Sequence, residues 1–186
     1  MPSREYQLSS GPNLISFPFL KQDGTRYLLE EFFESIEQNV IQNIEGLIGT
    51  GICASHIAPG VWIGSLSHID PRMGYWLKMS NNFEDQIVQF QYDERIPVTS
   101  NYTWELNSQG FLTPRTIMLS YPGLTAGLPQ DVLRPEIQHM IRGIIGEGVA
   151  AYNGDYDYSE PGGYPDCMPD GCNWVGSLTL TPNKGY

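Results

Sequence analysis

The sequence is poor in charged residues, and in basic residues above all. Asp, Glu, Lys and Arg make up 17% of the 186 residues, and 21 acidic side chains stand against 10 basic ones. The formal net charge at pH 7 is −11, so the chain repels phosphate backbones and anionic lipid headgroups. Nucleic acid and a membrane surface are therefore not expected as partners.

Long apolar runs are absent as well. No stretch approaches the roughly 18 apolar residues that cross a bilayer, so membrane insertion is not expected. The opening segment, MPSREYQLSSGPNLISFPF, contains no basic region followed by a long apolar one, which a secretory signal peptide requires. Either the protein is used without the general export route, or a leader is missing from this sequence.

Cysteine and histidine are scarce, with three residues of each. Cys53 lies in an apolar run and is expected to be a buried small hydrophobic residue. Cys167 and Cys172 lie close together in a polar loop and form a candidate disulfide, although two thiols alone make neither a redox motif nor a metal site. The histidines are His56, His68 and His139. No two of them have the spacing of metal ligands, so they are interpreted as surface or structural residues.

Apolar and turn-forming residues are plentiful. Hydrophobic residues account for 40% of the chain and aromatic residues for 12%, which is enough for a packed core. The chain also has 20 Gly and 14 Pro, which favour turns over long helices. The length suits one or two domains.

The chain contains the same unit twice. The segment GLIGTGICA at 46–54 matches GIIGEGVAA at 143–151, and WIGSL at 62–66 matches WVGSL at 174–178. The matching blocks follow the same order in both halves, which indicates a duplication rather than chance similarity.

This duplication predicts two tandem homologous domains, residues 1–95 and 96–186. The second has an insertion at 152–173, and it stops at a point where the first continues into two further strands. Because an unpaired sheet edge is unfavourable, we expect either that the chain is the front part of a longer polypeptide or that another chain completes the sheet by strand addition.

The predicted fold class is α+β, with each domain a mainly antiparallel β-sheet or sandwich of five or six strands and one helix. Two apolar runs around SSGPN predict a hairpin from Tyr6 to Phe17. Helical spacing of apolar residues over 25–44 predicts a helix with Thr25 as N-cap. Its counterpart at 128–143 contains Pro135 and is expected to be short or broken.

Two further segments complete this interpretation. The segment IVQFQYDE alternates Val88, Phe90 and Tyr92 with glutamines, which is typical of a half-buried strand. The polar stretch 93–103 is expected to be a linker.

The repeated motifs are interpreted as core anchors and tight turns. A nucleophilic serine in the Gly-Ser pairs would need a base and an acid, and neither copy offers a matching histidine. Exposed Trp or Tyr rings would suit sugar stacking, but recurrence at matched positions favours a core role. GIIGEGVA lacks the following helix of a dinucleotide fingerprint. The expected anchors are Phe17, Pro18, Trp62, Gly64, Ser65, Tyr75, Trp76, Tyr121, Pro122, Trp174, Gly176, Ser177 and Tyr186.

The insertion of the second copy is rich in carboxylates and tyrosines. Three interpretations stay open: a surface loop that contacts a protein or glycan, an ordered excursion pinned by the candidate disulfide, and a calcium site. An EF-hand fit fails because Tyr158 and Tyr164 take the glycine and glutamate positions. The candidate contact residues are Tyr152, Asp155, Tyr156, Asp157, Tyr158, Glu160 and Tyr164. No other cofactor is expected.

The series NLISFP, G-x-I-G-x-G-x-A, W-V-G-S-L and P-x-x-G-Y-W resembles a module of structural proteins in marine tailed phages, notably cyanophages, and of secreted or surface proteins of environmental bacteria. The resemblance covers most of the chain in two passes and carries no catalytic residues. It implies a non-enzymatic virion protein of the tail, fibre or capsid surface, with other virion proteins or copies of itself as partners. The alternative is a secreted adhesin or glycan-binding module at the cell surface. An enzyme would need a polar constellation that the repeated motifs lack.

Overall fold

A computed structural model describes residues 3–95, 118, 120–121, 126–138, 141–155, 172–182 and 184–186. The protein is mainly β, with antiparallel sheets and a few short helices. The chain divides into two compact units. Unit 1 comprises Met1–Pro97, Ile117–Pro122 and Asn183–Tyr186, and unit 2 comprises Val98–Thr116 and Gly123–Pro182. The predicted boundary between residues 95 and 96 stays a prediction.

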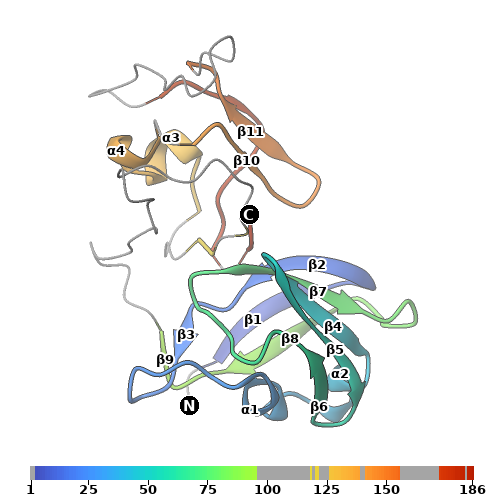
Figure 1. Cartoon of the computed structure of the whole chain (residues 1–186). Helices are drawn as coiled ribbons and strands as arrows, with labels where there is room; N and C mark the ends of the chain where they lie inside the picture. Colours follow the sequence, from blue (N-terminus) through green and yellow to red (C-terminus); the bar gives the residue numbers. More distant parts are fainter. Residues whose placement is uncertain are drawn as a thin grey trace. The chain divides into compact units, whose positions relative to one another are not determined.

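The described residues of unit 1 form three antiparallel sheets. The largest has the strand order β2-β7-β4-β5-β6, and two-stranded ladders join β1 to β8 and β3 to β9 (Figure 1). The strands are β1 Ser3–Leu8, β2 Gly11–Ser16, β3 Phe19–Leu20, β4 Ile44–Gly49, β5 Ile52–Ala58, β6 Val61–Gly64, β7 Gly74–Met79, β8 Gln86–Gln91 and β9 Glu94–Arg95.

The predicted hairpin is wrong in its pairing. Both strands exist, but β1 pairs with β8 and β2 pairs with β7. The side chain of Asn13 explains the corner between them, because it donates to the Ser9 carbonyl at 2.8 Å and accepts from the Ser9 amide at 2.8 Å. These backbone groups are thus satisfied by a side chain, and the two strands are free to join different sheets.

The core of unit 1 is rich in aromatic side chains. Phe17 lies at its centre, with ring centroids of Phe32 and Phe90 at 4.9 and 5.1 Å. Tyr6 adds an edge-on contact with Phe90 at 5.0 Å and donates its hydroxyl to the Ser16 carbonyl. Pairs of this kind stabilise a core beyond the apolar area they bury.

The predicted single helix is also wrong, because it is split into α1, Leu29–Glu34, and α2, Gln38–Ile41. The hydroxyl of Ser35 donates to the Phe32 carbonyl at 3.1 Å, which competes with continuation of the helix. Leu28 takes the N-cap position, and Thr25 instead bonds to the Asp23 carboxylate. Thr25 is therefore not the N-cap.

The strand predicted near the end of the first repeat is present as β8. Val88 and Phe90 are buried on β8, which confirms the half-buried strand. The expected linker does not begin at Asp93, since Glu94 and Arg95 form β9 against β3. Cys53 is exposed on β5 rather than buried, because its neighbour Ala54 occupies the inward position of the strand.

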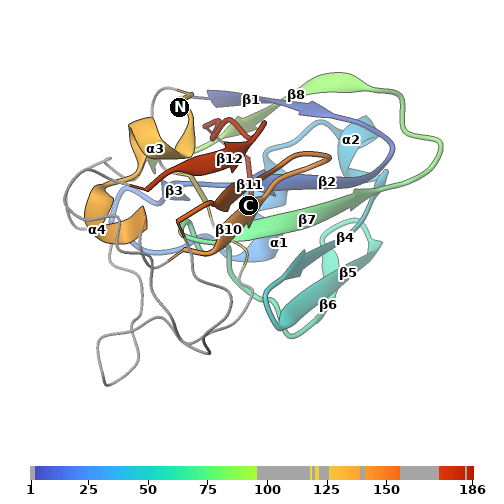
Figure 2. The same cartoon turned by 90° about the horizontal axis from the view of Figure 1, so that it is seen from above.

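The described part of unit 2 is smaller. Its three-stranded sheet has the order β10-β11-β12 (Figure 2). The elements are α3 Pro129–Val132, α4 Pro135–Gln138, β10 Gly143–Ile145, β11 Ala150–Asn153 and β12 Trp174–Gly176. Pro135 opens a new helix after a break, which confirms the short, broken helix expected there.

Strands β4, β5 and β6 of unit 1 and strands β10, β11 and β12 of unit 2 pair in the same register. Ala54 of β5 pairs with Gly64 of β6, and at the matched positions Ala151 of β11 pairs with Gly176 of β12. A Cβ on either glycine would overlap the neighbouring strand's backbone. The Trp-x-Gly-Ser-Leu motif therefore places a glycine where two strands approach closely, followed by a buried leucine, Leu66 or Leu178.

Unit 1 also contains two short segments from the second half of the sequence. Ser120 pairs with Gly185, as Ser16 pairs with Gly74 at the matched positions. Lys184 pairs with Ile15 of β2. Its carbonyl accepts the Ser16 hydroxyl at 3.0 Å. Lys184 thus occupies the edge of β2 that β7 leaves open, and Gly185 lies close to both Ile15 of β2 and Gly74 of β7.

Candidate functional site

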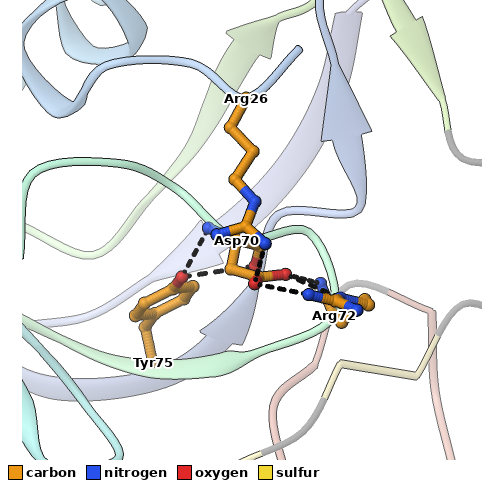
Figure 3. A network of polar contacts seen from close by, with 4 residues as sticks. All are labelled: Arg26, Asp70, Arg72 and Tyr75. Carbon is orange, nitrogen blue, oxygen red and sulfur yellow. Dashed lines mark hydrogen bonds and ion pairs between the residues drawn. The ribbon is translucent and has the colours of Figure 1, made fainter. Parts of the chain in front are cut away.

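A polar cluster surrounds Asp70 in the loop before β7 (Figure 3). Arg72 donates to both carboxylate oxygens of Asp70, from Nε at 3.2 Å and from Nη2 at 3.1 Å, and its backbone amide adds a third bond. Arg26, which precedes α1, lies 3.0 Å from Oδ2 of Asp70. Tyr75 of β7 accepts from the Asp70 amide at 2.7 Å. The cluster joins the loop to β7 and to the segment that precedes α1.

The cluster shifts two pKa values. Burial raises the pKa of Asp70, but hydrogen bonds from Arg72 and the charge of Arg26 outweigh this effect and hold it below the ordinary value. Burial raises the pKa of Tyr75 well above its usual range. At neutral pH a carboxylate therefore faces two guanidinium groups, and the phenol is neutral. This arrangement is suited to holding a loop.

A groove with a volume of about 370 Å³ lies beside β4 and β5. Its lining residues are Gln42, Ile44, Glu45, His56, Ile57, Ala58, Pro59 and Ser80. His56 contacts the Ile44 carbonyl through Nδ1 at 3.0 Å and lies against the Trp62 ring. Within the described residues, Nε2 of His56 and Nε1 of Trp62 are buried and have no hydrogen-bond partner.

The other two histidines are not among the residues that line this groove. His68 contacts the Ser67 hydroxyl at 2.9 Å and pairs with Leu28, and His139 lies outside the described residues. Over the described ranges, no group of three His, Cys, Asp or Glu side chains could hold a metal ion.

The predicted contact loop is described only at its two ends. Tyr152 is 53% exposed on β11. Asp155 accepts from the Asn173 amide at 2.6 Å, so it ties the two ends together. The remaining candidates, Tyr156, Asp157, Tyr158, Glu160 and Tyr164, lie outside the described residues, and a calcium site among them stays a prediction.

The candidate disulfide is described at one end. Cys172 is disulfide-bonded and buried, whereas Cys53 is a free thiol. The expected partner, Cys167, lies outside the described residues, so this pairing stays a prediction.

The structure places the repeated motif residues in three environments. Buried positions are Phe17, Pro18, Tyr75 and Trp174. Half-buried positions are Trp62, Trp76, Tyr121 and Tyr186, and the exposed ones are Gly64, Ser65, Gly176 and Ser177. The Ser65 hydroxyl accepts from the Cys53 amide at 3.2 Å. Pro122 lies outside the described residues.

Sequence reasoning missed Gln138, at the end of α4. Its side chain is 1% exposed, and its Oε1 accepts from the Cys172 amide at 2.9 Å and from Trp174 Nε1 at 3.2 Å. Its Nε2 donates to the Leu133 carbonyl at 2.7 Å. A glutamine in a short helix that begins at a proline gives no sequence signal for this role.

Sequence reasoning also missed a largely apolar surface that recurs in both units. We call it the outer face, and it consists of Ile48, Cys53, Ser55 and Ile63 in unit 1 and of Ile145, Ala150, Tyr152 and Val175 in unit 2. The strand registers place each set on one side of its sheet.

The outer face exposes large apolar side chains at matched positions. Ile48 and Ile63 are 47% and 59% exposed, and their counterparts Ile145 and Val175 are 60% and 58% exposed. Exposed apolar residues that cluster on one face are typical of interaction surfaces. The alternation of these strands shows which residues share a face of the sheet, but it does not show which face is left uncovered.

No family model, curated protein or solved structure matches the chain. The resemblance of its motifs to a phage module therefore stays a prediction. No helix in the described ranges is both long enough and apolar enough to cross a bilayer.

Proposed function

We propose that the protein is a non-enzymatic structural component of a tailed-phage virion, in the tail, a fibre or the capsid surface. It acts through protein–protein contacts, and its two units are tandem copies of one module. The outer face is the observation that carries the proposal, since both copies expose aliphatic side chains at the same two strand positions. The resemblance of the sequence motifs supports the assignment to a virion.

The shared registers support the duplication. The glycine that faces the neighbouring strand, the buried leucine after it and the exposed aliphatic residue before it recur with the same pairing. A module that repeats both its fold and its exposed apolar positions can present the same contact surface twice, which strengthens binding to a repetitive partner.

The decisive experiment is analysis of purified particles. We expect the protein to co-purify with virions at a fixed copy number, and its absence from particles would contradict the virion assignment. A charge on the outer face, in the double variant Ile63→Asp and Val175→Asp, is expected to reduce incorporation while the protein remains folded.

Ile87→Asp is the matched control. Ile87 is 60% exposed on β8, away from the outer face, so this variant carries a similar exposed apolar-to-acidic change. Equal incorporation of the double variant and the control would show that the outer face is not the contact surface.

A glycan-binding surface protein is the second candidate. Tyr152 is 53% exposed, and an exposed phenol ring is suited to stacking on a sugar. Binding on a glycan array that is lost in Tyr152→Ala and retained in Ile87→Asp would favour this function over the first.

A further inference from the structure

The outer edge of β10 in unit 2 has no partner among the strands that the structure describes. β10 pairs with β11 alone. The Asn153 amide donates to the Arg142 carbonyl, and the Gly146 amide donates to the Val149 carbonyl. Antiparallel ladders alternate, so the amide and carbonyl groups of Gly143 and Ile145 point to the other edge.

The matched strand of unit 1 shows what covers such an edge. β4 carries β7 there, with Gly46 opposite Lys78, Leu47 opposite Leu77 and Ile48 opposite Trp76. Gly143, Ile144 and Ile145 stand at the positions of Gly46, Leu47 and Ile48, because both strands pair with their hairpin partners in the same register.

Burial of the central residue differs between the two strands. Leu47 is fully buried, with Leu77 of β7 opposite it. Ile144 at the matched position is only half-buried. An apolar side chain that points inward next to an open edge gains burial when a strand is added.

We propose that the outer edge of β10 accepts one antiparallel strand from another polypeptide. The strand has the pattern of β7, with an apolar residue opposite Ile144 that faces inward. The proposal rests on the proposed function, because it names a contact through which the protein would join its neighbours. Strand addition supplies affinity through backbone hydrogen bonds and specificity through the inward side chain.

A second copy of this chain cannot donate its own β7 at low cost. β7 is hydrogen-bonded on both edges, to β2 and to β4. Its inward residues Tyr75, Leu77 and Met79 are fully buried. Release of β7 would therefore unfold the largest sheet of unit 1, so the donor strand is not the β7 of a second copy.

The probe is a labelled peptide, MGYWLKMS, with the sequence of residues 73–80. We expect it to bind the full chain saturably in fluorescence anisotropy. Bound peptide should slow hydrogen exchange at the amides of Gly143 and Ile145. No saturable binding, or protection at β4 instead of β10, would overturn the proposal.

Variants of the chain and of the peptide test the proposed strand pairing. Ile145→Pro removes an amide that points to the open edge and is expected to weaken binding about tenfold. Ile145→Ala keeps this amide and most of the affinity. Circular dichroism detects whether Ile145→Pro folds. If it does not fold, the N-methylated peptides described next test the proposal with the wild-type chain.

N-methylation of the peptide at Trp76 or Lys78 blocks an amide that would face β10, and a loss of about tenfold is expected. N-methylation at Leu77 blocks an amide on the opposite edge and should leave affinity nearly unchanged. Equal effects at Leu77 and Trp76 would contradict strand addition. Failure of these tests would leave the particle experiment unaffected, so the two proposals can be refuted separately.

Discussion

Asp70 is the side chain that holds the loop before β7. It is paired with Arg26 and Arg72, and its carboxylate is 13% exposed. The side chains of Arg26 and Arg72 are 48% and 41% exposed, so water screens part of their attraction to Asp70. The stability of the loop therefore depends on the three hydrogen bonds from Arg72 more than on the net charge of the cluster.

We predict that Asp70→Asn destabilises unit 1 by about 1–3 kcal/mol, because hydrogen bonds to a charged acceptor are lost. Since the pKa of Asp70 is lowered in the folded state, its contribution is complete above the ordinary carboxyl pKa. It is lost as the pH falls below about 4. Urea unfolding at several pH values should show the difference between wild type and variant shrinking in this range.

Glu84→Gln is the control for this experiment, because Glu84 is exposed. A difference between wild type and Asp70→Asn that stays constant down to pH 2.5 would contradict the assigned role of the carboxylate.

Gly64 and Gly176 provide a second prediction. Their φ angles of 155° and 140° are unfavourable for other residues, and a Cβ on either would overlap a carbonyl oxygen of the adjacent strand. Gly64→Ala and Gly176→Ala are each expected to cost about 2–4 kcal/mol, measured by thermal or denaturant unfolding.

Gly60→Ala separates the effect of backbone strain from the effect of overlap with the adjacent strand. Gly60 has a φ of 71°, but nothing lies within 4 Å of an added Cβ. Only backbone strain is introduced, and a loss of about 1 kcal/mol is expected. Equal losses at all three positions would show that close strand approach does not matter.

The corner between β1 and β2 decides how the elements of unit 1 are joined. Asn13 is 4% exposed and satisfies both polar groups of the Ser9 backbone. Because of this corner, two strands that are neighbours in sequence belong to separate sheets.

Asn13→Ala should therefore leave the Ser9 amide and carbonyl without these partners. We expect a loss of about 1–3 kcal/mol, with the largest increase in hydrogen exchange along β1 and β2. Asn82→Ala is the control, since Asn82 is exposed. Unchanged exchange along β1 would show that another contact sets the corner.

Sequence patterns predicted which segments are strands better than they predicted which strands pair. The alternation of Val88 and Phe90 places β8 correctly because it reports which side chains are buried. It cannot report that β8 pairs with β1, since pairing joins residues from opposite ends of the first repeat. The break at Ser35 was missed for a related reason, because apolar spacing continues through it.

The candidate site was predictable in part. The matched motifs located the glycines at the close strand approach, but the exposure of Ile63 and Val175 depends on what covers the sheet. A single strand's pattern does not contain this information. Gln138 was missed because its partners, Cys172 and Trp174, lie more than thirty residues away.

Unit 1 is completed by residues far apart in the chain. Gly185 donates to the Leu14 carbonyl at 3.3 Å, and a Cβ at this position would lie 2.8 Å from the Ile15 carbonyl oxygen. Residues that belong to the second repeat by sequence are thus part of the first sheet.

We predict that a chain ending at Pro182 loses about 1–3 kcal/mol of stability in unit 1, because the bonds to Leu14 and Ser16 are removed. Lys184→Ala keeps the carbonyl that Ser16 uses and should have a smaller effect. Denaturant unfolding of both variants measures the difference. An unfolding midpoint of the shortened chain equal to that of wild type would contradict this role.

The position of Lys184 and Gly185 on β2 also sets an order of events during synthesis. β2 leaves the ribosome early, but the residues that cover its open edge are made roughly 170 positions later. Contacts across so long a separation form slowly. Until these residues are synthesised, one edge of β2 is unpaired. Neighbouring nascent chains on the same messenger RNA are then at risk of pairing with each other through this edge.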